Sequence, residues 1–85
     1  MNQKVPVTVR SAIQRINRRL KPDNEMLKTA RGRYMRMQVG DYYIVNFNRN
    51  FILHTNVDPE LLGRELGVLH EWERVIDVDE QEEVT

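Results

Sequence analysis

The segment "TVRSAIQRINRRLKP", residues 8–22, is the stretch around which the fold is organised. At about 100° per residue its apolar side chains gather into an arc about 100° wide, which is the width of a core-facing stripe. These side chains are Val9, Ala12, Ile13, Ile16 and Leu20. Thr8 is a suitable N-cap, and Pro22 disfavours helical geometry at the residue before it. The pattern therefore predicts an amphipathic helix over about residues 8–20.

The other side of this predicted helix is strongly basic. Its cations are Arg10, Arg15, Arg18, Arg19 and Lys21, and the stretch contains no acidic residue. Like charges three or four residues apart on a helix repel by a few tenths of a kcal/mol. A helix that is merely solvated usually intersperses acids, so the pattern indicates that these cations meet a partner.

The charge of the whole chain is segregated in the same way. The chain is neutral, with 13 Lys and Arg against 13 Asp and Glu. Residues 1–38 contain ten of the cations and two acids, whereas residues 39–85 contain eleven acids and three arginines. Such an asymmetry between halves indicates a polyanionic partner or an interacting tail.

The centre of the chain changes to the period of a β-strand. In "YMRMQV", residues 34–39, apolar and polar side chains alternate, which predicts a half-buried strand. "MLKTA", residues 26–30, is either a strand of its own or the start of the same one. Gly32 lies between the two segments, where we expect a bulge or a kink.

A hairpin is expected immediately afterwards. "YYIVNF", residues 42–47, is rich in aromatic and β-branched residues and predicts a strand. "NRN", residues 48–50, suits a short loop because asparagine tolerates left-handed geometry, and "FILHTN", residues 51–56, returns. Together these segments predict an antiparallel meander of three strands.

A second helix is indicated by "VDPELLGRELG", residues 57–67. Asp58 can cap it, Pro59 fits its first position, and Gly67 is a natural left-handed terminator. We expect this helix over about residues 58–66. The following "LHEWERVIDV", residues 69–78, is expected to form a short helical turn or to dock irregularly.

The predicted fold class is α+β, in the order α-β-β-β-α, with two helices packed on one face of the three-stranded sheet. With 85 residues, a single domain is expected over residues 1–76. Residues 77–85 form an acidic segment with almost no apolar content, for which we predict disorder.

The absence of cysteine suits a reducing compartment, and no apolar run has the length of a signal peptide or membrane span, so a cytoplasmic protein is expected.

Several kinds of chemistry are disfavoured. The sequence has no phosphate loop and no nucleophile and base constellation, so no catalytic residue, no cofactor and no small-molecule substrate are predicted. His70 and Glu73 share a spacing of three, but two ligands are too few for zinc, and His54 lies on a predicted strand. A helix-turn-helix over residues 61–77 would place acids against phosphates, which argues against it.

Two further alternatives concern exposed apolar groups. Tyr34, Tyr42, Phe47 and Phe51 lie on predicted strands near arginines, as aromatic residues do on RNA-binding sheets, although such residues are also common in strands for packing reasons. A basic amphipathic helix can lie on an anionic membrane, but here the apolar stripe is needed for the core, so no membrane partner is expected.

The sequence thus predicts a small non-enzymatic binding module with a basic N-terminal surface. Its partner is expected to be nucleic acid or an acidic protein, with the acidic C-terminal segment able to compete. The alternative is an interaction protein or homodimer joined by a sheet edge or by complementary charged faces. "GDYYIVN" and "VDPELLGRELGVL" resemble small proteins of bacterial or phage origin and contain no motif that identifies a family. The candidate binding residues are Arg10, Arg15, Arg18, Arg19, Lys21, Arg31, Arg33 and Arg36.

Overall fold

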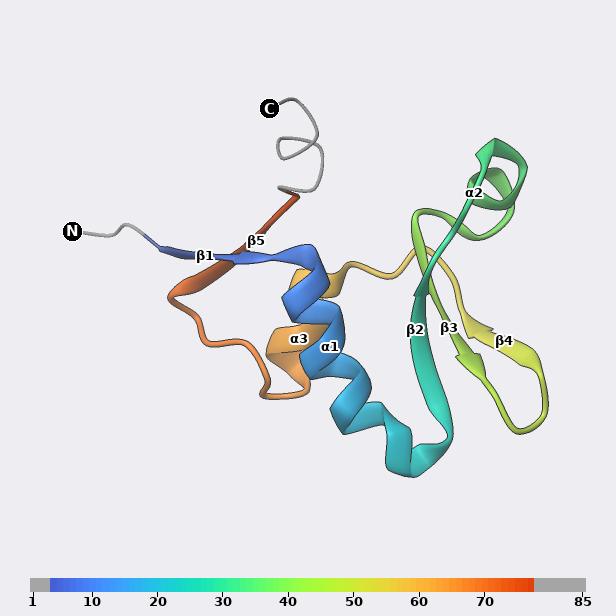
Figure 1. Cartoon of the computed structure of the whole chain (residues 1–85), viewed down its shortest axis with the longest axis horizontal. Helices are drawn as coiled ribbons and strands as arrows, with labels where there is room; N and C mark the ends of the chain where they lie inside the picture. Colours follow the sequence, from blue (N-terminus) through green and yellow to red (C-terminus); the bar gives the residue numbers. More distant parts are fainter. Residues whose placement is uncertain (1–3, 78–85) are drawn as a thin grey trace.

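The computed structural model describes residues 4–77 and confirms a mixed α+β fold that contains a three-stranded antiparallel sheet (Figure 1). The order of elements is longer than predicted, because strands also lie before the first helix and after the last one. The elements are β1 (Val5–Thr8), α1 (Val9–Leu20), a 3₁₀ turn (Lys21–Asp23), β2 (Glu25–Thr29), α2 (Arg33–Val39), β3 (Tyr42–Asn46), β4 (Phe51–His54), α3 (Pro59–Glu65) and β5 (Glu73–Ile76). No described helix is long and apolar enough to cross a membrane.

Helix α1 forms as its periodicity predicts. The Thr8 hydroxyl accepts a hydrogen bond from the Ser11 amide at 3.1 Å, which satisfies one of the amides that a helix start leaves unpaired. The helix gives way to the 3₁₀ turn at Lys21, beside Pro22. The residues that it buries are Val9, Ala12, Ile16 and Leu20.

The core lies mainly where α1 packs on the sheet. Ile16 and Leu20 of α1 contact Leu27 of β2 and Ile44 of β3, and all four are nearly inaccessible to solvent. Leucines of α3 and of its C-terminal end pack against the same cluster. Figure 1 shows α1 running from the β1–β5 pair towards the three-stranded sheet, and α3 packs against α1.

The β3–β4 hairpin is also confirmed. Strand β3 pairs antiparallel with β2 on one side and with β4 on the other. In the loop, Asn50 takes a left-handed conformation with φ 63°, and the Asn46 side chain accepts hydrogen bonds from the amides of Asn48 and Arg49. Asparagine suits both roles because it tolerates positive φ and its short amide reaches nearby backbone groups.

The predicted strand over residues 34–39 is wrong, because this segment forms helix α2. Met35 and Val39 are four residues apart and therefore share a helical face, which packs against Tyr43 on the sheet face opposite α1. Met37, the third member of the apparent alternation, is 76% exposed. The segment "MLKTA" is therefore a strand of its own, β2. Because β2 already pairs with one edge of β3, residues 34–39 cannot pair with β3 along that edge.

The prediction of a helical turn or irregular docking over residues 69–76 is wrong for its second half. Strand β5 pairs in parallel with β1, with Val5 opposite Glu73 and Thr8 opposite Ile76. Val7, Ala12 and Leu69 form a small buried cluster beneath this pair. Both strands have only four residues and lie at opposite ends of the chain, so no local pattern announces their pairing. The disorder predicted for residues 77–85 falls, apart from Asp77 itself, on residues outside the described range.

Polar side chains cover two of the strand edges. The Asn17 side chain accepts a hydrogen bond from the Leu27 backbone amide at 2.7 Å and donates one to the Leu27 carbonyl at 3.1 Å. These are the two backbone hydrogen bonds that a neighbouring strand would otherwise make with Leu27 of β2. On β5, the Val75 amide donates to Glu60 at 2.8 Å, and the Glu73 carbonyl accepts from Arg64 at 2.8 Å. Covered edges of this kind cannot pair with another chain.

Candidate nucleic-acid interface

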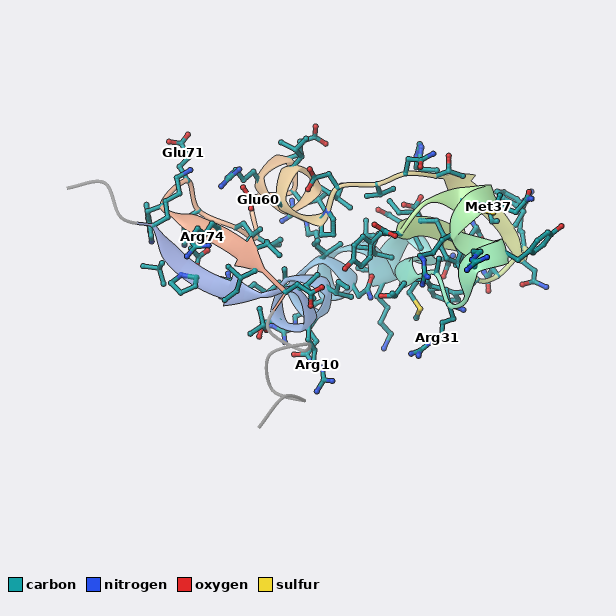
Figure 2. The ribbon with its side chains drawn as sticks, turned by 90° about the horizontal axis from the view of Figure 1, so that it is seen from above. Arg10, Arg31, Met37, Glu60, Glu71 and Arg74 are labelled. Carbon is teal, nitrogen blue, oxygen red and sulfur yellow. The ribbon has the colours of Figure 1, made fainter. Side chains whose placement is uncertain are left out.

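Three of the predicted arginines line one hollow between α1 and the β2–α2 segment. Arg10 comes from the first turn of α1, Arg31 from the connection after β2, and Arg36 from α2. The hollow has a volume of about 590 Å³. Figure 2 shows Arg10 and Arg31 projecting on the same side of the molecule. We refer to this site, with Arg10, Arg31 and Arg36, as the arginine cleft.

The backbone at Gly32 shapes one side of the cleft, the β2–α2 segment. Its φ of 84° lies in the region that favours glycine, and it turns the chain from β2 into α2. The remaining lining is apolar or uncharged, and none of the described residues that line the cleft is acidic. These lining residues are Val9, Ile13, Gln14, Thr29, Ala30 and Gly32.

The arrangement is suited to binding an anion with several oxygen atoms. Each guanidinium presents planar donors that match the oxygens of a phosphate or a carboxylate. Gln14 and Thr29 are uncharged polar residues beside them and offer further hydrogen-bonding groups. Because three cations share a hollow without a described carboxylate, their field favours an anionic ligand at this point of the surface.

Arg15 is not part of the cleft, because it is held by the C-terminal part of the chain. Its Nη1 donates to Glu73 Oε1 at 3.0 Å and to the Val68 carbonyl at 3.1 Å. Glu73 is buried, with 8% of its surface exposed, and also accepts a hydrogen bond from the His70 amide. The guanidinium of Arg15 therefore ties α1 to β5, and its charge is largely neutralised.

The other candidate cations do not line the cleft. Arg18 and Arg19 lie with Arg15 and Val68 around a second hollow of about 320 Å³. Lys21 borders a third hollow of about 310 Å³ beside Met26. Arg33 is exposed on α2. The basic surface predicted as one field is thus divided between the cleft and the opposite side of α1.

Apart from Arg15, the predicted cations have no carboxylate partner within residues 4–77. The described ion pairs are Arg15 with Glu73, and Arg64 with Glu60 at 2.9 Å. The remaining guanidinium and ammonium groups of the candidate set make no hydrogen bond or ion pair with another described residue. They are Arg10, Arg18, Arg19, Lys21, Arg31, Arg33 and Arg36.

The aromatic residues do not form the stacking face that an RNA-binding sheet presents. Tyr34 is 76% exposed, but it lies on α2, beside Arg33. Tyr42 packs against the core between α1 and the sheet. Phe47 and Phe51 are about half exposed at the hairpin end of the sheet, away from α2. Tyr34 is therefore the exposed aromatic side chain of this group on α2, the helix that also carries Arg36.

The histidines have other surroundings. The His70 ring stacks on Trp72, with ring centroids 4.2 Å apart and an angle of 6° between the planes. His54 is exposed on β4. Within the part of the chain that the structure describes, no three His, Asp or Glu side chains gather closely enough to hold a metal ion.

Two hydrogen-bonded carboxylates make the stability of the fold sensitive to acid. The hydrogen bond from the His70 amide and then the Arg15 guanidinium hold the pKa of Glu73 below its usual 4.5. The Val75 amide and then Arg64 lower the pKa of Glu60 in the same way. Because each pKa is lower in the folded than in the unfolded chain, the stability that these groups contribute is fully present above the unfolded value and is lost as the pH falls through the folded one.

We therefore predict that the thermal unfolding midpoint falls as the pH drops below about 4.5, the usual pKa of these carboxyl groups, and that it falls less for E73Q. Glutamine retains an oxygen that can accept from His70 but has no charge for Arg15. At neutral pH the variant should be less stable than the parent, and the difference should shrink on acidification. Circular dichroism melts at a series of pH values measure this, and a difference that is independent of pH would contradict the assignment.

The sequence analysis did not identify Gln14 and Thr29, the uncharged polar residues that line the cleft beside the arginines. Gln14 lies four residues after Arg10 and so shares its helical face, a spacing that could have been read from the sequence. Thr29 ends a strand that the sequence did predict as one alternative. No sequence signal pairs Arg15 with Glu73, because the two are 58 positions apart.

Comparison with known proteins adds no further assignment: no family model matches the chain, and neither curated proteins nor solved structures yield a significant match.

Proposed function

We propose that this protein is a non-enzymatic binding module that contacts the phosphate backbone of nucleic acid through the arginine cleft. The observation that carries the proposal is the convergence of Arg10, Arg31 and Arg36 from three separate segments on one hollow without a described acidic residue. Arginine binds phosphate through paired hydrogen bonds, and its contact with a polyanion also releases counterions, which adds to the affinity.

The surroundings of the cleft favour a polymeric ligand over a small anion. Arg33 lies on the same short helix as Arg36. Arg18 and Arg19 offer further cations without a described carboxylate partner on the other side of α1. A chain of phosphates can contact several of these cations in turn, whereas a single anion would fill the cleft alone. Tyr34, which is 76% exposed beside Arg33, can stack on an unpaired base. These features favour single-stranded nucleic acid.

The proposal is tested by fluorescence anisotropy with labelled single-stranded DNA, single-stranded RNA and duplex DNA. Binding should be detectable at about 20 mM salt and should weaken linearly on a logarithmic salt scale, because bound counterions are released. Poly-glutamate serves as the competing class of ligand. Failure to bind any oligonucleotide at the lowest salt would refute the proposal, and tighter binding of poly-glutamate would assign the cleft to an acidic protein.

A homodimer is the second candidate, and the observation that favours it is the outer edge of β4. Among the described residues, no hydrogen bond from another element reaches this edge, in contrast to the edges of β2 and β5. Phe51 and Ile52 are 45% and 43% exposed there, and the strand carries no charged residue that would prevent pairing. Two β4 strands related by a twofold axis can pair antiparallel and extend the sheet.

Sedimentation equilibrium distinguishes this second candidate. If the β4 edge pairs, the parent chain should show a dimer that dissociates on dilution and changes little with salt, since the edge is uncharged. I52K should be monomeric, because a lysine on an exposed edge opposes pairing. A parent chain that remains monomeric at all concentrations would remove the homodimer, and a salt-sensitive dimer would assign the interface to charged faces instead.

A further inference from the structure

The pairing of β1 with β5 brings the last described residues of the chain beside the start of α1, where Arg10 lines the arginine cleft. Strands β1 and β5 run in parallel, and Thr8, the last residue of β1, lies opposite Ile76, the last residue of β5. The chain after Thr8 enters α1 through Val9 and Arg10, which both line the cleft. The chain after Ile76 therefore starts from the same end of the molecule as Arg10.

The composition and length of this segment suit the cleft. Residues 78–85 contain four carboxylates and no basic residue; the carboxylates are Asp79, Glu80, Glu82 and Glu83. Eight residues span at most about 26 Å when extended. The intermediate dimension of the molecule is 30 Å, so this reach is comparable to the breadth of the fold. The cleft, with three arginines and no described carboxylate of its own, has the complementary charge.

We propose that residues 78–85 of the chain occupy the arginine cleft in the absence of ligand, with their carboxylates against Arg10, Arg31 and Arg36. The segment is tethered next to its site, so its effective concentration there is on the order of millimolar, and contacts that are weak individually can keep the cleft occupied. If the proposed function holds, nucleic acid must displace the segment. Affinity then depends on the competition between phosphates and carboxylates for the same guanidinium groups.

The contact can be observed without any nucleic acid. The sequence contains no cysteine, so T85C carries the only thiol and can be spin-labelled at a single position. We expect the label to broaden the amide resonances of Arg31 and Gly32, and the broadening to disappear at high salt. The labelled chain with E82Q and E83Q serves as the matched variant and should show markedly less broadening. Absence of broadening at the cleft, or broadening around Arg18 and Arg19 instead, would overturn the proposal.

Binding measurements then test the competition, which rests on the proposed function. E82Q/E83Q should bind single-stranded DNA about threefold to tenfold more tightly than the parent at low salt, and the gain should vanish once salt screens the contact. The control is E65Q/E71Q, which removes the same charge from exposed positions on the α3 side of the molecule. An equal gain in the control would overturn the competition. Broadening at the cleft in a chain that binds no nucleic acid would support the intramolecular contact and refute the proposed function alone.

Discussion

Replacing Arg10, Arg31 and Arg36 together by glutamine is expected to lower the affinity for single-stranded DNA on the order of 100-fold at about 50 mM salt. Each phosphate that a cation neutralises contributes a logarithmic salt slope of about 0.7 for a single strand, so the removal of three cations should flatten the slope by about 2. The salt slope is the sharper readout, because it reports how many phosphates the protein neutralises and not only the strength of binding. Anisotropy titrations at several salt concentrations provide both values.

A matched control separates a specific cleft from the general attraction of a basic surface. Arg49 and Arg74 are exposed and do not line the cleft, and Figure 2 shows Arg74 at the end of the molecule formed by β1 and β5. R49Q/R74Q should therefore bind within about threefold of the parent, with a nearly unchanged slope. Thermal melts establish that both variants are folded. Comparable losses of affinity in the two variants would contradict a site in the cleft.

The pairing of Arg15 changes which substitutions on α1 are informative. Reversing the charge of Arg15 would leave the Glu73 carboxylate beside another carboxylate, so any loss of binding could follow from a disturbed fold. Arg18 and Arg19 make no described ion pair and can be changed without this effect. R18Q/R19Q consequently shows whether the ligand extends from the cleft along α1.

The largest effect on stability is expected for G40A. Gly40 has φ 83° and ψ −171°, a conformation that is essentially restricted to glycine and costs other residues about 1–3 kcal/mol. An added Cβ would also overlap the Asn56 side chain and lie 2.9 Å from the Asn56 Cα, where a backbone atom must move. Overpacking of this kind costs about a further 1–3 kcal/mol. We expect the free energy of unfolding to fall by about 2–6 kcal/mol, a large share of the total for a small domain.

G32A is the control that isolates the backbone contribution. Gly32 has a nearly identical φ of 84°, but nothing lies within 4 Å of the position that its Cβ would take. Its substitution should therefore cost only about 1–3 kcal/mol from the strained conformation. Urea denaturation of both variants measures the difference. Equal losses of stability would show that the close approach of Gly40 to Asn56 contributes nothing to the stability of the fold.

Elements with strong local signals were predictable from sequence, and α1 is the clearest example. Its stripe, its Thr8 cap and the Pro22 stop all act within a few residues of one another. Helix α3 likewise begins at Pro59 after the Asp58 cap, whose carboxylate accepts from the Glu60 amide at 2.9 Å. Helix α2 was not predictable in this way, because three apolar residues at alternate positions fit a strand as well as they fit a helix that exposes Met37.

For the candidate site, the sequence alone determined which residues are cationic, that they gather in the first half of the chain, and that much of this charge lies on the outer side of α1. Tertiary structure decided how these cations divide: Arg10 joins Arg31 and Arg36 in the cleft, whereas Arg15 is neutralised by Glu73. It also decided that the acidic segment follows a strand ending beside the start of α1. The physical reason is that charge and helical periodicity are local properties of the chain. The pairing of β1 with β5, in contrast, joins segments more than 60 residues apart and depends on how α1 packs against both sheets.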